Sequence, residues 1–162
     1  MRDVTGCHST TAGWREWVAL PEQNVEWIKA KLDTGARTSS LHAFGIEEFE
    51  REGASWARFG VHPWQRSSEE VQCEAPLVDR RTVRSSSGHT GDRPVVRMAV
   101  RLLGQDIHVE VTLTGRDEMG FRMLIGREAL RQGFLVDSGR SYLGGRPKRA
   151  VRRRNRGVSG AP

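Results

Sequence analysis

The sequence predicts a mainly β protein, a small closed β barrel with one short helix near its C-terminal end. Two observations favour this fold class. Many short segments alternate apolar and polar residues with the period of two that strands have, and only one late segment, residues 127–132, is typical of a helical turn. Because 162 residues suffice for one domain with a single core, we expect the folded domain at residues 14–145. Residues 1–13 are then a flexible N-terminus and residues 146–162 a disordered basic tail.

The first two predicted strands lead to an aspartate. Residues 13–21 alternate large apolar and polar side chains and stop at a proline, as a strand does. Residues 27–32 alternate in the same way and end at Asp33, which is followed by Thr34 and the turn residue Gly35. The sequence therefore predicts a carboxylate held at the end of a rigid strand.

The middle of the chain predicts a hairpin and a further short strand. Residues 46–52 and 55–62 alternate on either side of a turn at residues 53–54. Residues 64–70 are predicted as a loop, and residues 71–75 as a short strand. The core candidates of the hairpin are Phe49, Trp56, Phe59 and Val61.

The second half predicts a polar connection followed by the clearest hairpin of the chain. Residues 84–93 are polar, contain glycine and lack periodicity, so we expect an exposed, mobile connection between two strands. Residues 96–102 and 107–113 alternate around a turn at residues 104–106. Residues 114–120 are predicted as a loop and residues 121–125 as a strand. Residues 127–132 are predicted as a helical turn that Gly133 ends, and residues 134–136 as a last strand.

Residues 14–145 resemble a known family through a set of motifs. The family is that of retropepsin-like aspartic endopeptidases labelled ATP-dependent zinc proteases and associated with ATP-grasp glutamate ligases. The central motif is Lys-Ala-Lys-Leu-Asp-Thr-Gly-Ala-Arg-Thr-Ser-Ser-Leu-His-Ala at residues 29–43. The others are Gly-Trp-Arg-Glu-Trp-Val, Arg-Ser-Ser-Ser-Gly-His-Thr, Leu-Ile-Gly-Arg-Glu-Ala-Leu and Phe-Leu-Val-Asp.

The resemblance implies an aspartic peptidase that works as a homodimer. The chain is about half as long as a two-lobed pepsin-like enzyme, so each of two chains would supply one Asp33 to a catalytic dyad. One carboxylate would take a proton from a water, while its protonated partner polarises the scissile carbonyl. Thr34 would bond across to the partner loop, and Gly35 would let the substrate backbone approach and offer its carbonyl.

The resemblance also assigns substrate-binding and supporting residues. An extended peptide would add as a strand, with residues 85–92 closing over it as a flap. Arg37 either pairs with Glu128 or recognises an acidic or glutamate-rich substrate, and Arg127 then needs another acidic partner. The assigned residues are Ala36, Arg37, Ser87, Gly88 and His89 for substrate, and Gly126 and Arg127 for structural support.

We predict neither a metal nor a cofactor. The zinc label would require two histidines one helical turn apart with a glutamate beside the first, and the sequence has no His-Glu-x-x-His. No pair among the five histidines has ligand spacing. A second Asp-x-Gly motif starts at Asp137, but too little chain follows it to form a second lobe, so we do not expect it to be catalytic.

The net charge of +6 belongs to the tail rather than to the domain. Residues 146–162 hold seven of the 26 basic side chains and no acidic one, which leaves 19 basic and 20 acidic side chains in residues 1–145. Such a tail is either a solvated end or a contact for nucleic acid or acidic protein. The alternative to an enzyme is therefore a non-catalytic binding or regulatory module on the same fold, with the tail as its contact.

Composition predicts a cytoplasmic protein without a membrane partner. The sequence contains no run of about 18 apolar residues, and its first residues lack the apolar segment of a signal peptide. Two cysteines are too few for a disulfide framework, which agrees with a reducing compartment.

Overall fold

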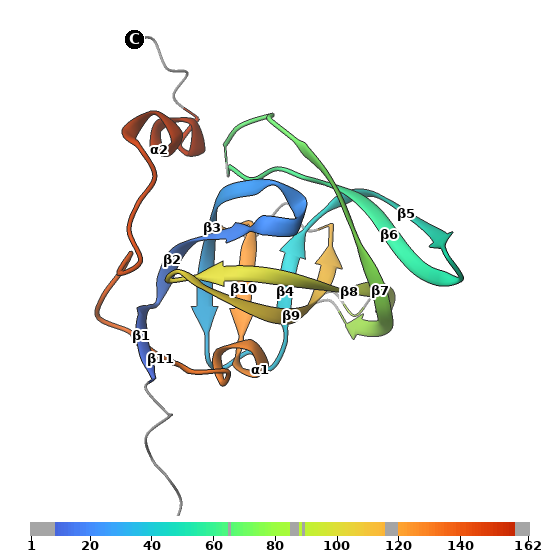
Figure 1. Ribbon diagram of the computed structural model, residues 1–162, viewed down its shortest axis with the longest axis horizontal. Coiled ribbons are helices and arrows are strands. Elements are labelled where there is room, and N and C mark those ends of the chain that lie inside the picture. The colour runs from blue at the N-terminus through green and yellow to red at the C-terminus, as the bar shows by residue number, and fades with distance from the viewer. Residues whose placement is uncertain (1–8, 65, 85–87, 89, 116–119, 158–162) are drawn as a thin grey trace, which may run out of the picture.

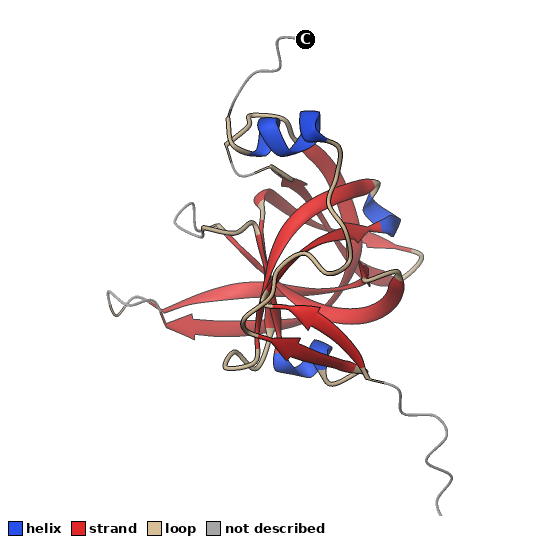
Figure 2. Cartoon of the chain, turned by 90° about the vertical axis from the view of Figure 1, so that its left-hand side faces the viewer, coloured by secondary structure: helices blue, strands red, loops and turns tan. Residues whose placement is uncertain are grey.

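The computed structural model describes residues 9–64, 66–84, 88, 90–115 and 120–157, and it is mainly β (Figure 1, Figure 2). No helix in this part of the chain is long and apolar enough to cross a bilayer. The elements, in chain order, are β1 (Thr10–Gly13), β2 (Arg15–Leu20), the 3₁₀ helix η1 (Pro21–Gln23), β3 (Val25–Asp33), β4 (Ser39–His42), β5 (Phe44–Arg51), β6 (Ala54–Val61), β7 (Val71–Arg84), β8 (Thr90–Leu102), β9 (Gln105–Thr114), β10 (Met123–Gly126), α1 (Arg127–Leu130), β11 (Phe134–Asp137) and α2 (Arg149–Asn155).

Six strands close into a barrel. Their order around the ring is β2-β3-β10-β4-β9-β8, and β2 pairs again with β8, which completes the circle. The closing seam has a single registered pair, Ala19 with Arg101, next to a hydrogen bond from the Ala99 amide to the Glu22 carboxylate (2.8 Å). Beyond β8 the same sheet continues through β7, β6 and β5. This topology confirms the predicted small closed barrel.

The inward positions of these strands form one apolar core. Alternate residues of β3 are buried while their neighbours are exposed or half-buried, as the period of two requires. Burying a large aliphatic side chain contributes roughly 1.5–3 kcal/mol, so this core dominates the stability of the barrel. Its largest fully buried apolar members are Phe59, Leu20, Ile28, Leu41, Met98, Leu102, Leu113, Met123 and Ile125.

The hairpin of β5 and β6 lies where the sequence predicts it, but two of its four core candidates are not in the core. Phe59 is fully buried, whereas Phe49 and Trp56 are only half-buried and face each other across the two strands. Their rings instead pack against the Arg51 guanidinium, 5.2 and 4.5 Å from the two ring centroids. Arginine stacking covers apolar surface that the barrel does not reach.

The predicted short strand at residues 71–75 is much longer in the structure. β7 has 14 residues and pairs antiparallel with β8 up to Arg84, which is opposite Thr90. Residues 79–82 of β7, Asp-Arg-Arg-Thr, are polar on both faces, so burial periodicity gives no signal there. Ion pairs to neighbouring strands hold it instead, from Arg80 to Glu48 and from Arg81 to Glu110 (3.4 Å).

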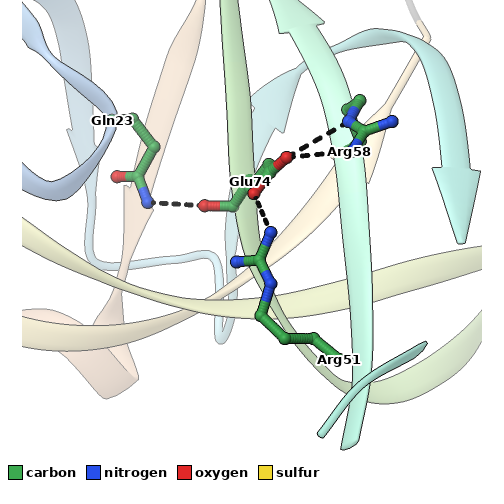
Figure 3. A network of polar contacts seen from close by, with 4 residues as sticks. All are labelled: Gln23, Arg51, Arg58 and Glu74. Atoms are coloured by element: carbon green, nitrogen blue, oxygen red, sulfur yellow. Dashed lines mark hydrogen bonds and ion pairs between the residues drawn. The ribbon is translucent and has the colours of Figure 1, made fainter. Parts of the chain in front are cut away.

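A polar network outside the barrel links η1 to β7 and to the β5–β6 hairpin (Figure 3). The Glu74 carboxylate accepts hydrogen bonds from Arg51 (2.5 Å) and from two nitrogens of Arg58 (3.1 and 3.2 Å). These two guanidiniums lower the pKa of the Glu74 carboxyl below its ordinary value. The Gln23 amide donates to the Glu74 carbonyl (3.2 Å), so the network fixes η1 against the strand.

The flexible N-terminus predicted for residues 1–13 is wrong for its last four residues. β1 pairs in parallel with β11, in register from Thr10 opposite Phe134 to Gly13 opposite Asp137. Ala12 is fully buried. The Thr-Thr-Ala-Gly sequence of β1 has no periodicity of its own, because its partner strand lies more than a hundred residues later in the chain. Residues 1–8 lie outside the described residues.

The tail predicted to be disordered is also wrong for its described part. Residues 149–155 form the helix α2, which lies beside the barrel (Figure 1). Arg154 binds Glu69 (3.6 Å) and stacks on Trp64 (5.6 Å), while Asn155 is 2% exposed and its carbonyl accepts from the Arg66 amide (3.1 Å). Polar anchoring to the loop before β7 therefore orders a segment whose only apolar residues are Ala150 and Val151. Residues 158–162 lie outside the described residues.

Candidate active site

Asp33 is the last residue of β3, and its carboxylate is held by the turn that follows. Its Oδ1 accepts hydrogen bonds from the amides of Gly35 (2.9 Å) and Ala36 (3.3 Å). Asp33 is half-buried, whereas Thr34 and Gly35 are exposed. The carboxylate thus has a fixed orientation at an open end of the barrel, as the sequence predicts for a strand that ends in Asp-Thr-Gly.

The first turn of α1 holds the Asp33 loop, which we define as residues 33–38. The amides of Arg127 and Glu128 donate to the carbonyls of Ala36 (2.7 Å) and Arg37 (3.0 Å). The Arg127 guanidinium donates to the Thr34 carbonyl (3.1 Å), so its partner is a backbone oxygen and not the acidic side chain that the sequence predicts. The start of α1 therefore fixes the loop along its whole length.

Gly126 allows this close approach. β10 lies between β3 and β4, with Gly126 directly opposite Asp33 (Figure 1). A Cβ on Gly126 would lie 2.4 Å from the carbonyl oxygen of Thr38 and 2.9 Å from that of Ala36, closer than side-chain carbons approach backbone. The Gly126 amide also donates to the buried Ser39 hydroxyl (3.0 Å).

Arg37 and Glu128 form an exposed ion pair beside the loop. The Arg37 Nε lies 3.7 Å from a Glu128 carboxylate oxygen, and the two side chains are 77% and 50% exposed. Glu128 also pairs with Arg131 at 3.6 Å. Ion pairs this exposed are worth little, so the contact leaves the Arg37 guanidinium accessible to other anions.

A cavity of about 590 Å³ lies next to the Asp33 loop. Its polar lining is mixed, with two arginines against three carboxylates. The side chains come from the end of the loop, from β7 and β9, and from α1. The lining residues are Arg37, Thr38, Ser39, Asp79, Arg81, His108, Val109, Glu110, Glu128, Ala129 and Gln132.

The predicted flap, residues 85–92, falls between the end of β7 at Arg84 and the first residues of β8, and it stays a prediction. The predicted loop at residues 84–93 is too long, because β8 already begins at Thr90. Gly88 is exposed and has a positive φ of 83°, as a tight turn requires. Ser87 and His89 lie outside the described residues. The hydrogen-bond network of the Asp33 loop does not include Gly88.

The second Asp-x-Gly motif folds locally like the first but lies elsewhere. The Asp137 Oδ1 accepts from the Gly139 amide (2.9 Å), which repeats the bond between Asp33 and Gly35. Asp137, however, ends β11, which pairs only with β1 in a separate two-stranded sheet. The two aspartates therefore do not belong to one site within this sheet arrangement.

Two polar residues that support the site region were missed from the sequence. Ser39 binds the Gly126 amide, and Glu16 is a fully buried carboxylate that accepts from the amides of Gly13 (2.7 Å), Leu143 (2.9 Å) and Gly144 (3.0 Å). The signal for Glu16 was present in the sequence, because a carboxylate occupies an apolar-phase position of the first strand. Buried carboxylates need several donors, and here one comes from β1 and two come from the chain that follows β11.

Within the described residues, no three His, Cys, Asp or Glu side chains converge as metal ligands. The site offers a half-buried carboxylate held by two backbone amides, next to the exposed residues Thr34 and Gly35.

Comparisons with known proteins identify the family. The family model described as "Retropepsin-like aspartic endopeptidase RimB" matches residues 11–147. The chain is similar to two curated proteins named "Probable alpha-L-glutamate ligase", with 47% identity over 131 residues to that of Shewanella pealeana and 42% over 126 residues to that of Desulfotalea psychrophila. These matches cover 80% and 77% of this chain, but 29% and 27% of the relatives. The chain thus spans less than a third of their length.

A solved structure gives the same result at the level of the fold. A protein of unknown function from Legionella pneumophila is 29% identical, with a TM-score of 0.74, and the match covers 83% of this chain and 98% of that one. The family match includes both the Asp33 loop and the Gly126–Arg127 pair that holds it. The chain therefore belongs to the RimB-like family of retropepsin-like aspartic endopeptidases.

Proposed function

We propose that this protein is an aspartic endopeptidase that acts as a two-fold homodimer. The observation that carries the proposal is the Asp33 loop, in which a carboxylate is oriented by two backbone amides and clamped from behind by α1. Each chain supplies one such loop, and a two-fold axis is the simplest way to bring two identical loops together. The exposed Thr34 and Gly35 provide the surface over which a partner loop would pack.

The mechanism follows from two carboxylates at close range. Two neighbouring Asp33 side chains share one proton, because both cannot be ionised at a separation of a few Å. The ionised carboxylate takes a proton from water as its oxygen attacks the peptide carbonyl carbon, and the other carboxyl gives its proton to the carbonyl oxygen. The tetrahedral species then collapses, the C–N bond breaks, and the nitrogen leaves as an amine after accepting a proton.

Activity is expected to require the dimer, since one chain holds half of the dyad. Specific activity should fall on dilution below the dimer dissociation constant and recover on reconcentration. Sedimentation or light scattering at the same concentrations should show the mass changing in parallel. A monomer that retains full turnover at every dilution would exclude the shared dyad and direct attention to another site.

We propose acidic or glutamate-rich peptides as substrates. Arg37 is adjacent to the catalytic loop and highly exposed, and a guanidinium fork suits carboxylate recognition. The relatives named as glutamate ligases support the same substrate class. The neighbouring cavity has more carboxylates than arginines, so an acidic side chain would bind at Arg37 rather than deep in that cavity.

Arg37→Ala should therefore lower kcat/KM for an acidic peptide by on the order of tenfold more than for a neutral peptide of the same length. Arg131→Ala is the matched control, because Arg131 pairs with the same Glu128 at a similar distance. This control should leave the ratio of the two kcat/KM values unchanged. Equal losses for both peptides in Arg37→Ala would mean that Arg37 only braces Glu128.

A binding module on the same fold is the second candidate, and the ordered basic helix α2 favours it. It predicts partner binding that does not depend on Asp33 and an absence of peptide hydrolysis in the dimer. A purified dimer that cleaves no peptide library, acidic sequences included, would favour this candidate.

A further inference from the structure

A small basic pocket lies between the barrel and the C-terminal segment. Its volume is about 140 Å³, large enough for one phosphate-sized group. Four of its seven lining residues are cations and none is an acid. We call this the basic pocket, and its lining residues are Trp17, Lys29, Tyr142, Arg146, Arg152, Asn155 and Arg156.

Within the described part of the chain, the positive charge of the basic pocket is not balanced by acidic partners. Among the described residues, no salt bridge involves the pocket cations Arg146, Arg152 or Arg156. The Nε of Arg152 is buried and has no hydrogen-bond acceptor. Like charges that converge without a counter-ion repel one another, and a bound anion would remove this repulsion and supply the missing acceptor.

The helix that carries two of these arginines is anchored by other residues. Arg154 binds Glu69 and Trp64, and Asn155 is buried against the loop before β7. Arg152 and Arg156 are one helical turn apart and line the pocket, so they are placed on the same side of α2. Asn155 belongs to both the anchor and the pocket, whereas Arg154 anchors the helix without lining the pocket. Arg152 and Arg156 can therefore be changed while the Arg154 anchor is kept.

Aromatic rings lie around the pocket, and they favour nucleic acid over an acidic polypeptide as its ligand. The Tyr142 ring has Arg146 at 4.9 Å, Arg15 at 4.9 Å and Lys29 at 5.6 Å from its centroid. Trp14, which also stacks with Arg15 at 4.7 Å, is half-buried on the same face. Interleaved arginines and rings suit nucleic acid, because bases stack on both groups while phosphates take the guanidinium forks. An acidic polypeptide would use only the charges.

We propose that the basic pocket and α2 bind single-stranded RNA, with one backbone phosphate in the pocket. Three of the seven lining residues, Arg152, Asn155 and Arg156, follow residue 147, where the family match ends, so α2 brings to the pocket side chains that lie outside the matched residues. The proposal stands apart from the peptidase function, because RNA binding is measured without a peptide substrate.

The test is fluorescence anisotropy of a labelled single-stranded RNA of about 12 nucleotides. The RNA is titrated with the full chain, in whichever oligomeric state it has, at salt concentrations between about 50 and 200 mM KCl. The variant is Arg152→Gln with Arg156→Gln, and the matched control is Arg97→Gln with Arg131→Gln. The control removes the same charge from exposed positions outside the pocket. Circular dichroism and thermal unfolding verify that both variants fold.

The pocket variant should bind RNA roughly tenfold more weakly, and its salt slope should be smaller by about 0.7 for one lost phosphate contact. The control should keep the parent affinity within about twofold. Equal weakening in the two variants would overturn the proposal, since net charge alone would then explain binding. Stronger binding of poly-L-glutamate than of RNA at equal charge and salt would also overturn it, by identifying an acidic polypeptide as the partner.

Discussion

Replacing Asp33 with asparagine should reduce peptide hydrolysis by roughly 10³-fold or more while leaving the fold and the dimer intact. Asparagine keeps an oxygen that can accept from the Gly35 and Ala36 amides, so the turn after β3 survives. It removes the group that must exchange a proton with water. The measurement is kcat/KM of the purified variant on a peptide that the parent cleaves, together with its mass and melting temperature.

The control for this substitution is Asp137→Asn. Asp137 makes the same bond to the amide two residues later, although without a counterpart of the Ala36 bond, and it is carried by a different sheet. Asp137→Asn should retain parent activity. Turnover of Asp33→Asn at the parent rate would disprove the dyad.

A chelator should not inhibit the parent protein. Inhibition by a chelator, with recovery when zinc is added, would restore the zinc hypothesis.

Gly126→Ala should inactivate the protein and lower its melting temperature by roughly 10 °C. The new methyl group would lie 2.4 Å from the Thr38 carbonyl oxygen, and this backbone cannot retreat without breaking the bonds from the Arg127 and Glu128 amides. The Asp33 loop would then lose its clamp. Thermal unfolding gives the stability, and kcat/KM gives the effect on the loop.

Gly139→Ala is the comparison for Gly126→Ala. Gly139 also follows an aspartate turn, but its Cβ would meet only the Asp137 Oδ1, at an ordinary 3.4 Å, and its φ is not positive. It should therefore change the melting temperature by little more than the experimental error. A Gly126→Ala protein that is as stable and active as Gly139→Ala would show that the loop tolerates displacement.

The Asp33 loop could be predicted because its signals are local. A strand that ends in Asp33, the turn at Gly35 and the pair Gly126–Arg127 are each visible within a few residues. The alternation of β3, β8 and β9 is equally local, and these strands lie close to the predicted ranges. Short-range patterns therefore gave the barrel and the position of the carboxylate.

Features that depend on distant partners were not predictable in this way. β4 was not predicted because its four residues have no clear alternation, and it is fixed by pairing with β9 and β10. Helix α2 was missed because Asn155 and Arg154 are anchored by a loop some ninety residues earlier. The Arg127 guanidinium donates to a backbone carbonyl, and a backbone acceptor leaves no signal in the residue pattern.

The seam between β2 and β8 has the fewest registered residue pairs in the ring. Across the seam only Ala19 and Arg101 are in register. β10 and β4 share two registered pairs, at Met123 and Leu124, and all other adjacent strands around the ring share several. Thermal fluctuations should therefore open the barrel here first and leave one edge each of β2 and β8 unpaired. Such edges are templates for another chain, so the seam is also where two copies would exchange strands at high concentration.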